Sequence, residues 1–218
     1  MNGTALIEEF RDLSQDLNEP YLWDDTFVLG KLNEAEREAA DRARLLFDDA
    51  TVTVVDIAVT AGTAKYATSP LILDIERAFW VVSDEATPLH LYDRHELDRL
   101  RDDWRTESDT PTGLVWDGVN VTLNRVPLVD GTIHLEVHRL PATSFTASTS
   151  PEIPTIHHTE LVSWALFRAF SVPDADGANP ELAGVYLGRF ERYFGRKRGA
   201  NLRRSQRANK PHVNKTWW

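Results

Sequence analysis

Apolar residues recur at helical spacing near the start of the chain. The first such set is Leu6, Phe10, Leu13 and Leu17. Pro20 lies beyond it, so the spacing predicts an amphipathic helix of about three to four turns. A second helix is predicted to begin at Asp24 or Asp25, where a carboxylate can accept the free amide hydrogens of the first turn, and to end at about Phe47. The face of this helix from Glu34 to Glu38 is expected to be exposed to water.

Strand-like alternation replaces the helical period at Thr51. The middle of the chain is rich in β-branched and aromatic residues, which favour strands. After a strand beginning at Thr51, further strands are expected at Lys65–Ala67, Ile72–Val82, Gly113–Trp116, Val119–Arg125 and Thr132–Arg139. A short helix is predicted at Asp93–Trp104. Asp117-Gly118 and Asp130-Gly131 are typical of hairpin turns, because glycine tolerates the positive φ that such turns require.

Helical spacing returns after Pro154. Apolar residues cover much of the circumference between Thr155 and Phe170, so this helix should be buried on most sides. Asn179-Pro180 predicts the start of a further helix, because asparagine caps well and proline has no amide hydrogen to leave unpaired at the first position. That helix should stop at Gly195.

The order of these elements indicates an α+β fold: a four-helix bundle with a β-rich insertion between the second and third helices and an extended C-terminal arm. Neither pair of helices can bury a core alone, so residues 1–50 and 151–195 should form the bundle together. Residues 51–140 should form the β-rich insertion subdomain, and residues 141–150 a linker rich in Ser, Thr and Pro. Residues 196–218 form the basic arm.

Charge is distributed unevenly along the chain. The 218 residues include 34 acidic and 24 basic ones, for a net charge of −10. Nine of the basic residues and none of the acidic ones lie from Arg192 onward, so the first 191 residues carry 15 basic against 34 acidic residues, or −19. An acidic body with a basic tail points to an interaction arm, although a solvated terminus explains the tail equally well.

Composition excludes several kinds of chemistry. The chain has no cysteine, which removes disulfides, thiolate nucleophiles and zinc ribbons together. No run approaches the roughly 20 apolar residues that span a bilayer. The first residues do not resemble a signal peptide, so we expect a protein used without secretion and without a membrane partner.

Two local clusters invite a metal-site hypothesis, but neither has the spacing of ligands. His157 and His158 point about 100° apart on a helix and lack a partner at i+4, so packing or hydrogen bonding near a helix start is the better interpretation. Asp174 and Asp176 resemble the opening of a calcium loop, but Pro180 falls among the later ligand positions. Since phosphate-binding and nucleophile motifs are also missing, we expect no enzyme activity, no catalytic residue, no cofactor and no metal.

The tryptophans fall into two groups. Five of them lie among apolar residues and are candidates for a core or an interface: Trp23, Trp80, Trp104, Trp116 and Trp164. Trp217 and Trp218 instead end a hydrophilic tail and have no local core to join. Aromatic side chains of this kind often anchor an arm in a pocket of a partner.

Several motifs together resemble the head–tail adaptor, or connector, proteins of tailed phages, most closely those of short-tailed phages. The clearest portion comprises Pro151-Glu152-Ile153-Pro154, His157-His158, Leu161, Trp164-Ala165-Leu166, Arg168-Ala169-Phe170, Asp174-Ala175-Asp176, Asn179-Pro180, Phe190 and Phe194-Gly195. The N-terminal portion comprises Tyr21-Leu22-Trp23-Asp24-Asp25, Leu32-Asn33-Glu34-Ala35 and the run from Val59 to Ala67. The resemblance covers most of residues 5–195, but no single motif is as specific as a nucleotide-binding loop.

This resemblance implies a structural virion protein. Members of the family form a ring, of about twelve copies, between the portal protein and a tail or nozzle protein, and DNA passes through the ring without specific binding. The protein would be located in the neck of the virion and assembled in the host cytoplasm. The C-terminal arm would then bind the portal through Arg196, Lys197, Arg198, Arg203, Arg204, Arg207, Lys210, Lys215, Trp217 and Trp218.

Two other classes of function remain open from the residues alone. A nucleic-acid-binding protein could use the basic arm on phosphates, but a body of −19 opposes the approach of DNA and no recognition helix is evident. An unrecognised enzyme, such as a hydrolase with carboxylates on the β-rich region, would need residues that converge only in the folded chain.

Overall fold

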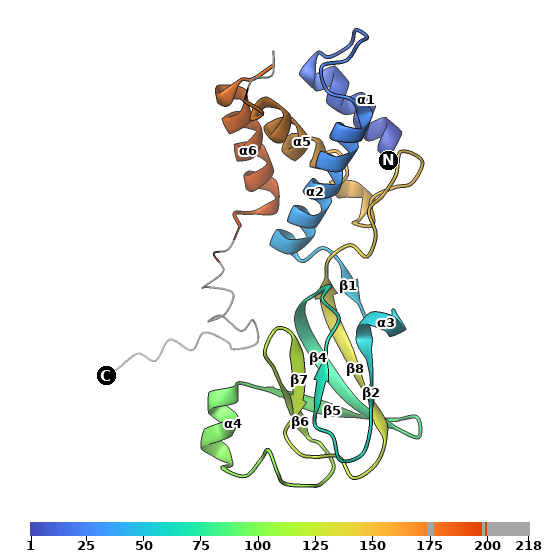
Figure 1. Ribbon diagram of the computed structural model, residues 1–218, viewed down its shortest axis with the longest axis vertical. Coiled ribbons are helices and arrows are strands. Elements are labelled where there is room, and N and C mark those ends of the chain that lie inside the picture. Colours follow the sequence, from blue (N-terminus) through green and yellow to red (C-terminus); the bar gives the residue numbers. More distant parts are fainter. Residues whose placement is uncertain (174–176, 198, 200–218) are drawn as a thin grey trace, which may run out of the picture. The chain divides into compact units, whose positions relative to one another are not determined.

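The chain folds into two compact units, each with a hydrophobic core of its own. The computed structural model describes residues 1–173, 177–197 and 199 (Figure 1). Residues Met1–Leu46 and the described residues from Leu140 to Lys197 form the helical unit, and Phe47–Arg139 form the sheet unit. The segments before Phe47 and after Arg139 therefore contribute to one unit, and the residues between them form the other.

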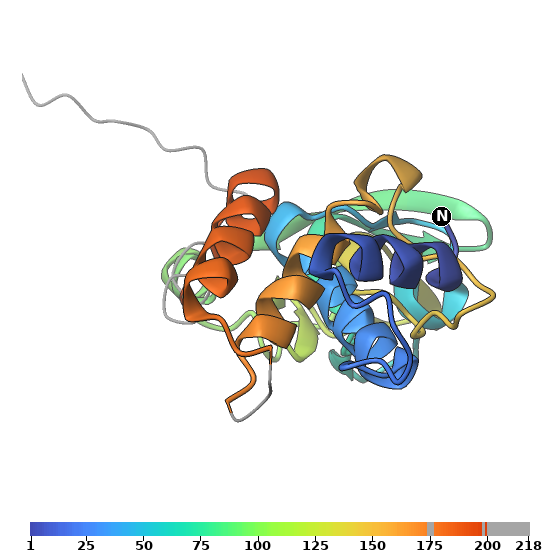
Figure 2. The same ribbon diagram turned by 90° about the horizontal axis from the view of Figure 1, so that it is seen from above.

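The helical unit is arranged around one buried helix, α5. Its elements are α1 (Gly3–Ser14), α2 (Asp25–Ala43), the 3₁₀ turn η1 (Thr155–His157), α5 (Leu161–Phe170) and α6 (Pro180–Phe194). Helices α1, α2 and α6 all contact α5, and Figure 2 shows α5 between α6 and the other two helices. Eight of the ten residues of α5 are buried, which confirms that this helix is enclosed on most sides.

Local signals set the ends of these helices. The Asp24 carboxylate accepts a hydrogen bond from the amide of Phe27 at 2.7 Å and so caps α2. Asn179 caps α6 in the same way, and Pro180 occupies its first position. Gly195 ends α6 with a φ of 86°, as its sequence predicts. Helix α2 stops earlier than predicted, because Arg44 adopts a left-handed conformation with a φ of 54°.

The sheet unit contains eight strands and two short helices. The strands are β1 (Phe47–Asp48), β2 (Asp56–Val59), β3 (Lys65–Ala67), β4 (Ile72–Val82), β5 (Glu85–Tyr92), β6 (Gly113–Trp116), β7 (Asn120–Leu123) and β8 (Gly131–Arg139), and the helices are α3 (Val52–Val55) and α4 (Arg94–Leu100). Their order is β1-β8-β4-β5-β6-β7-β3, and β2 also pairs with β8. Strands β5 and β6 are parallel and the other pairs are antiparallel, so the sheet is mixed.

Strand β8 shows why this sheet forms its own core. Its alternate residues Ile133, Leu135 and Val137 are fully buried, whereas the residues between them are half-exposed. The neighbouring strand β4 contributes Ile75, Ala78 and Trp80 to the same cluster. This period of two puts one apolar face of the sheet into the core.

The predicted fold class, a four-helix bundle carrying a β-rich insertion, is wrong. The described residues form six helices and a curled, mixed sheet of eight strands, so the fold is rich in strands and the sheet is not a minor insertion into a bundle. Two of the helices, α3 and α4, belong to the sheet unit. Sequence periodicity underestimated the sheet because strands β1 and β5 lack the alternation by which strands are recognised.

Individual strands were predicted with mixed success. The bounds of β3, β4 and β6 agree with the sequence prediction. The strand expected from Thr51 is wrong at its start, because residues Val52–Val55 form a helical turn before β2 begins at Asp56. Gly118 has the positive φ of a hairpin turn, 97°, but Gly131 already belongs to β8.

A buried ion pair joins the first and last strands of the sheet unit. Asp48 of β1 pairs with Arg139 of β8, 91 residues away in sequence, and both side chains are nearly buried. The same carboxylate accepts hydrogen bonds from the amides of Ala50 and Thr51. Burial by itself would raise the pKa of Asp48, but the hydrogen bonds from Thr51, Ala50 and Arg139 outweigh it and lower the pKa from 3.8 to about 2.

Replacing Trp164 by Ala should destabilise the helical unit by about 3–5 kcal/mol, because it removes a large aromatic side chain from a core. Trp164 is only 8% exposed, and its ring lies 5.0 Å from that of Phe190. Urea unfolding followed by circular dichroism measures the loss. Leu100→Ala, at a position 62% exposed, is the control and should unfold like the parent. A Trp164→Ala protein that also unfolds like the parent would contradict the placement of α5 in the core.

Replacing Asp48 by Asn should lower the free energy of unfolding at neutral pH by about 2 kcal/mol, the equivalent of the lowered pKa. Because the folded pKa of Asp48 lies below its ordinary value, its contribution is complete above pH 3.8 and is lost as the pH falls toward about 2. The difference between parent and variant should therefore shrink over that range. Asp49→Asn, at the exposed neighbouring position, is the matched control. A constant difference from pH 7 to pH 2 would show that the charge of Asp48 is not responsible.

Candidate functional site

The two adjacent histidines have different surroundings and do not converge on one point. His158 is buried, and its Nε2 lies 2.9 Å from the carbonyl oxygen of Ile153 and its Nδ1 3.0 Å from the terminal nitrogen of Met1. His157 packs edge-on against the rings of Tyr193 and Phe194. Both histidines thus pack or hydrogen-bond near a helix start. Among residues 1–173, 177–197 and 199, no group of three or more His, Asp or Glu side chains could hold a metal ion.

The acidic turn before α6 is only partly described. Asp174 and Asp176, which resemble the start of a calcium loop, lie outside the described residues. Asn179 at the end of this turn uses its side-chain oxygen to accept from the amide of Leu182 at 3.1 Å. That oxygen is therefore engaged in capping α6.

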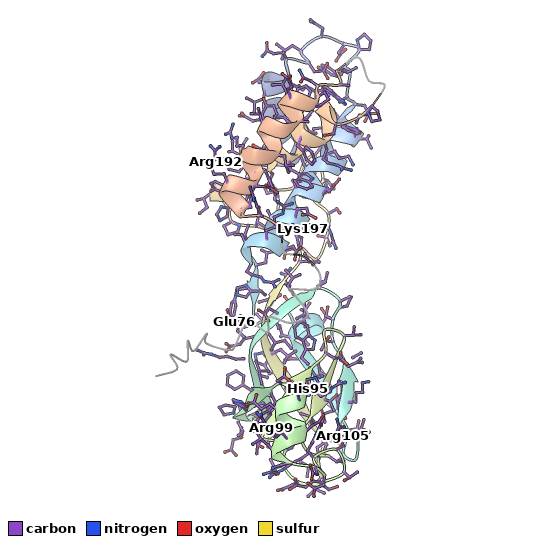
Figure 3. All side chains as sticks on the ribbon, turned by 90° about the vertical axis from the view of Figure 1, so that its left-hand side faces the viewer. Glu76, His95, Arg99, Arg105, Arg192 and Lys197 are labelled. Carbon is purple, nitrogen blue, oxygen red and sulfur yellow. The ribbon has the colours of Figure 1, made fainter. Side chains whose placement is uncertain are left out.

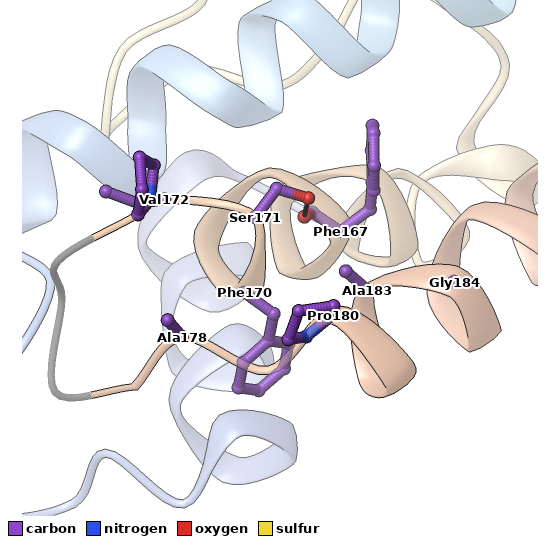
Figure 4. A pocket seen from close by; sticks show the side chains of 9 residues that line it. Phe167, Phe170, Ser171, Val172, Ala178, Pro180, Ala183 and Gly184 are labelled. Carbon is purple, nitrogen blue, oxygen red and sulfur yellow. Dashed lines mark hydrogen bonds between the residues drawn. The ribbon is translucent and has the colours of Figure 1, made fainter.

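One hollow of about 430 Å³ lies where α5 ends and α6 begins (Figure 4). Its walls are mainly apolar, formed by Phe167, Phe170, Pro173, Pro180 and Ala183. The hydroxyl of Ser171 donates a hydrogen bond to the carbonyl of Phe167 at 2.6 Å. Binding sites for small molecules combine an apolar wall with a few polar groups aimed at the ligand. The described lining of this hollow supplies an apolar wall, with Ser171 as its one polar side chain.

Glu36 of α2 was missed as a buried carboxylate. Glu36 lies about 200° around the helix from Glu34, and so on the side opposite the Glu34–Glu38 face that the sequence assigned to water. The residue is only 1% exposed. One carboxylate oxygen accepts hydrogen bonds from the amides of Glu152 and Ile153. Burial raises the pKa of Glu36, and these two amides partly offset the rise. Glu36 thereby attaches the segment before η1 to α2, a contact between residues more than 100 positions apart that no local pattern indicates.

The segment expected to be a linker, residues 141–150, packs on the helical unit. Phe145 is buried in the core of that unit. The Asn33 side chain both accepts from the amide of Phe145 at 2.8 Å and donates to its carbonyl oxygen at 3.0 Å. The one signal in the sequence for this contact was that Phe145 is an apolar residue within the Ser- and Thr-rich run 141–150.

The basic arm is described only at its beginning. Arg196 is strongly exposed, with its guanidinium 3.5 Å from the carboxylate of Glu191, and Lys197 pairs with Glu38 of α2 (Figure 3). The remaining predicted arm residues, Arg198, Arg203, Arg204, Arg207, Lys210, Lys215, Trp217 and Trp218, lie outside the described residues.

The internal tryptophans of the described residues belong to the cores of the two units. Four of the five internal tryptophans are buried, and Trp116 packs partly buried against the core of the sheet unit. In the part of the chain that the structure describes, no helix has both the length and the apolar character that crossing a membrane requires.

Comparison with known proteins shows the family of this chain. A search of curated proteins finds no match. The family model described as SU10 adaptor protein matches residues 1–213. This match spans both units and includes every motif on which the resemblance to phage head–tail adaptors rested. The chain therefore belongs to the SU10 adaptor protein family, a family of phage head–tail adaptors.

Proposed function

We propose that this chain forms a ring, of about twelve copies, that joins the portal to the tail and continues the channel for DNA. The observation that carries the proposal is the family match over residues 1–213. The partners are the portal protein on one side and a tail or nozzle protein on the other. The protein acts as a structural part of the neck, without catalysis, and it is assembled into the particle in the host cytoplasm.

The charge of the body suits a channel through which DNA must slide. Residues 1–191 carry a net charge of −19. A basic lumen would retain DNA, because phosphates that bind Lys or Arg release counterions and gain free energy. An acidic lumen repels the phosphates and leaves the DNA free to move. DNA would therefore pass through this ring without specific binding.

The same charge limits assembly in the absence of a partner. Bringing many acidic bodies together in a closed ring is repulsive unless another surface compensates. We therefore expect isolated protein to be monomeric or weakly associated, and the ring to form on the portal as a template. Once one subunit has docked, its neighbours bind at a high effective concentration, so modest contacts from each copy are sufficient.

The arm is the part of the chain best suited to bind the portal. Its eight basic residues from Arg196 onward would pair with acidic surface, but charge alone gives a weak contact that salt screens. Trp217 and Trp218 would add buried aromatic anchors, each on the order of 2 kcal/mol, the usual threshold for an interface hot spot.

Particles made without this protein should have heads that are filled with DNA or leaking, and that lack tails, because the connection below the portal is missing. Electron microscopy of such particles tests the proposed function. Tailed particles without the protein would contradict it. A salt-dependent shift of DNA by the purified protein would instead support the alternative, a nucleic-acid-binding protein that uses the basic arm.

Deleting residues 210–218 should leave the fold intact and weaken attachment to the portal, because both aromatic anchors are lost. Replacing Trp217 and Trp218 by Ala should have much of the same effect. The measurement is retention on immobilised portal rings, with Leu100→Ala as a control at an exposed apolar position of the sheet unit. Equal retention of the full-length, truncated and Trp-substituted proteins would show that the arm is not an anchor.

A further inference from the structure

We propose that the outer face of α6 binds the outer face of α1 in a second copy of this chain. The α6 face consists of Val185, Gly188, Arg189 and Arg192, and the α1 face of Glu8, Asp12 and Leu13. The inference rests on the proposed ring and names the surfaces through which neighbouring subunits meet.

The α6 face is opposite the side of the helix that enters the core. Ala183, Phe190 and Phe194 are buried, whereas Val185 is 64% exposed. A Cβ atom added at Gly188 would meet no other atom within 4 Å, so no described part of this chain covers the position. Glycine is disfavoured in the interior of a helix compared with alanine. Gly188 has no side chain and lies beside the exposed Val185, so another chain can approach the helix closely there.

Two arginines give this face a positive charge. Arg192 projects from α6 in Figure 3, and it is exposed and forms no ion pair with the described residues. Arg189 has a half-exposed side chain whose Nε lies 3.4 Å from a carboxylate oxygen of Glu160. An ion pair at such an exposed position contributes little. Both guanidinium groups are thus available to a partner of opposite charge.

The α1 face has the complementary character. Leu6 and Phe10 turn into the core, and Glu8 and Asp12 lie one turn apart on the exposed side. Neither carboxylate forms an ion pair with the described residues. Leu13, predicted to be part of the apolar stripe, is instead 39% exposed beside them. This face therefore offers two negative charges and an apolar side chain.

The placement of the two faces fits a ring of identical subunits. Helices α1 and α6 lie on opposite sides of α5 within the helical unit (Figures 1 and 2). A ring is built from head-to-tail contacts, in which one surface of a subunit meets a different surface of the next. Contact between two α6 faces, or two α1 faces, would bring like charges together. Charge complementarity thus favours the α6–α1 contact and selects against a two-fold dimer through either face.

Charge reversal tests the contact. The α6 variant is Arg189→Glu with Arg192→Glu, the α1 variant is Glu8→Arg with Asp12→Arg, and a third protein carries all four changes. Each full-length protein is titrated onto portal rings, and the number of bound copies is measured by native mass spectrometry. Each single-face variant should need about a tenfold higher concentration to fill the ring. The protein with all four changes should return toward the parent, because opposite charges again face each other.

The control is Arg37→Glu with Arg99→Glu, which changes the net charge by the same amount as the α6 variant but at exposed positions of α2 and α4. It should fill the ring like the parent, and thermal melting should show that all variants remain folded. The α6–α1 contact would be overturned if the protein with four changes did not regain the parent's filling of the ring. It would also be overturned if the control filled the ring as poorly as the single-face variants. If the parent fills the ring and both single-face variants do too, the faces are wrong but the ring stands. If the parent itself forms no ring on the portal, the proposed function fails.

Cross-linking gives a second measurement, because the chain has no native cysteine. A chain with Val185→Cys and Leu13→Cys, bound to portal rings and treated with a short thiol cross-linker, should yield a ladder of multimers. A chain with Leu100→Cys and Leu13→Cys should yield few. Equal ladders from the two proteins would overturn the contact. Loss of the cross-link when DNA is added would also overturn it, because the α6 arginines would then bind nucleic acid.

Discussion

The burial of α5 is the constraint on which the helical unit depends. This helix is apolar around most of its circumference, so it is stable only when other helices surround it. Helices α1 and α2 come from the start of the chain and α6 from its end. The intervening 93 residues, Phe47–Arg139, must therefore leave and return, and they fold into a sheet with its own core. Asp48 and Arg139, at the two ends of this excursion, pair with each other.

Buried and exposed charged side chains have different roles in this protein. Glu36 and Asp48 are buried, and each accepts backbone hydrogen bonds that compensate for the loss of water. They hold segments of the chain together. The exposed charges on α1 and α6 have few such contacts, and in the proposed ring they would determine how one acidic body meets the next. An assembly protein needs this second group, because like-charged bodies do not approach without local complementarity.

The family of this chain is one of structural phage proteins. The hollow at the junction of α5 and α6 has an apolar lining. Membership in the adaptor family agrees with this feature. In the proposed ring, repetition would multiply contacts that are modest individually. The arm and the two helix faces would then act on different partners, the portal and the adjacent subunit.

The sequence by itself determined the ends of several elements and the family. Asn179, Pro180 and Gly195 mark the limits of α6 because caps act within one turn, and the β-branched and aromatic run Ile72–Val82 identified β4. The fold class was wrong because β5 carries polar residues and Pro88, which do not look like a strand in the sequence. A strand tolerates proline on a side that is not paired, and β6 pairs with β5 only from His90. The burial of Glu36 and the pairing of Asp48 with Arg139 join residues about a hundred positions apart. Only the tertiary structure decided these contacts, because their energy comes from partners that local sequence does not contain.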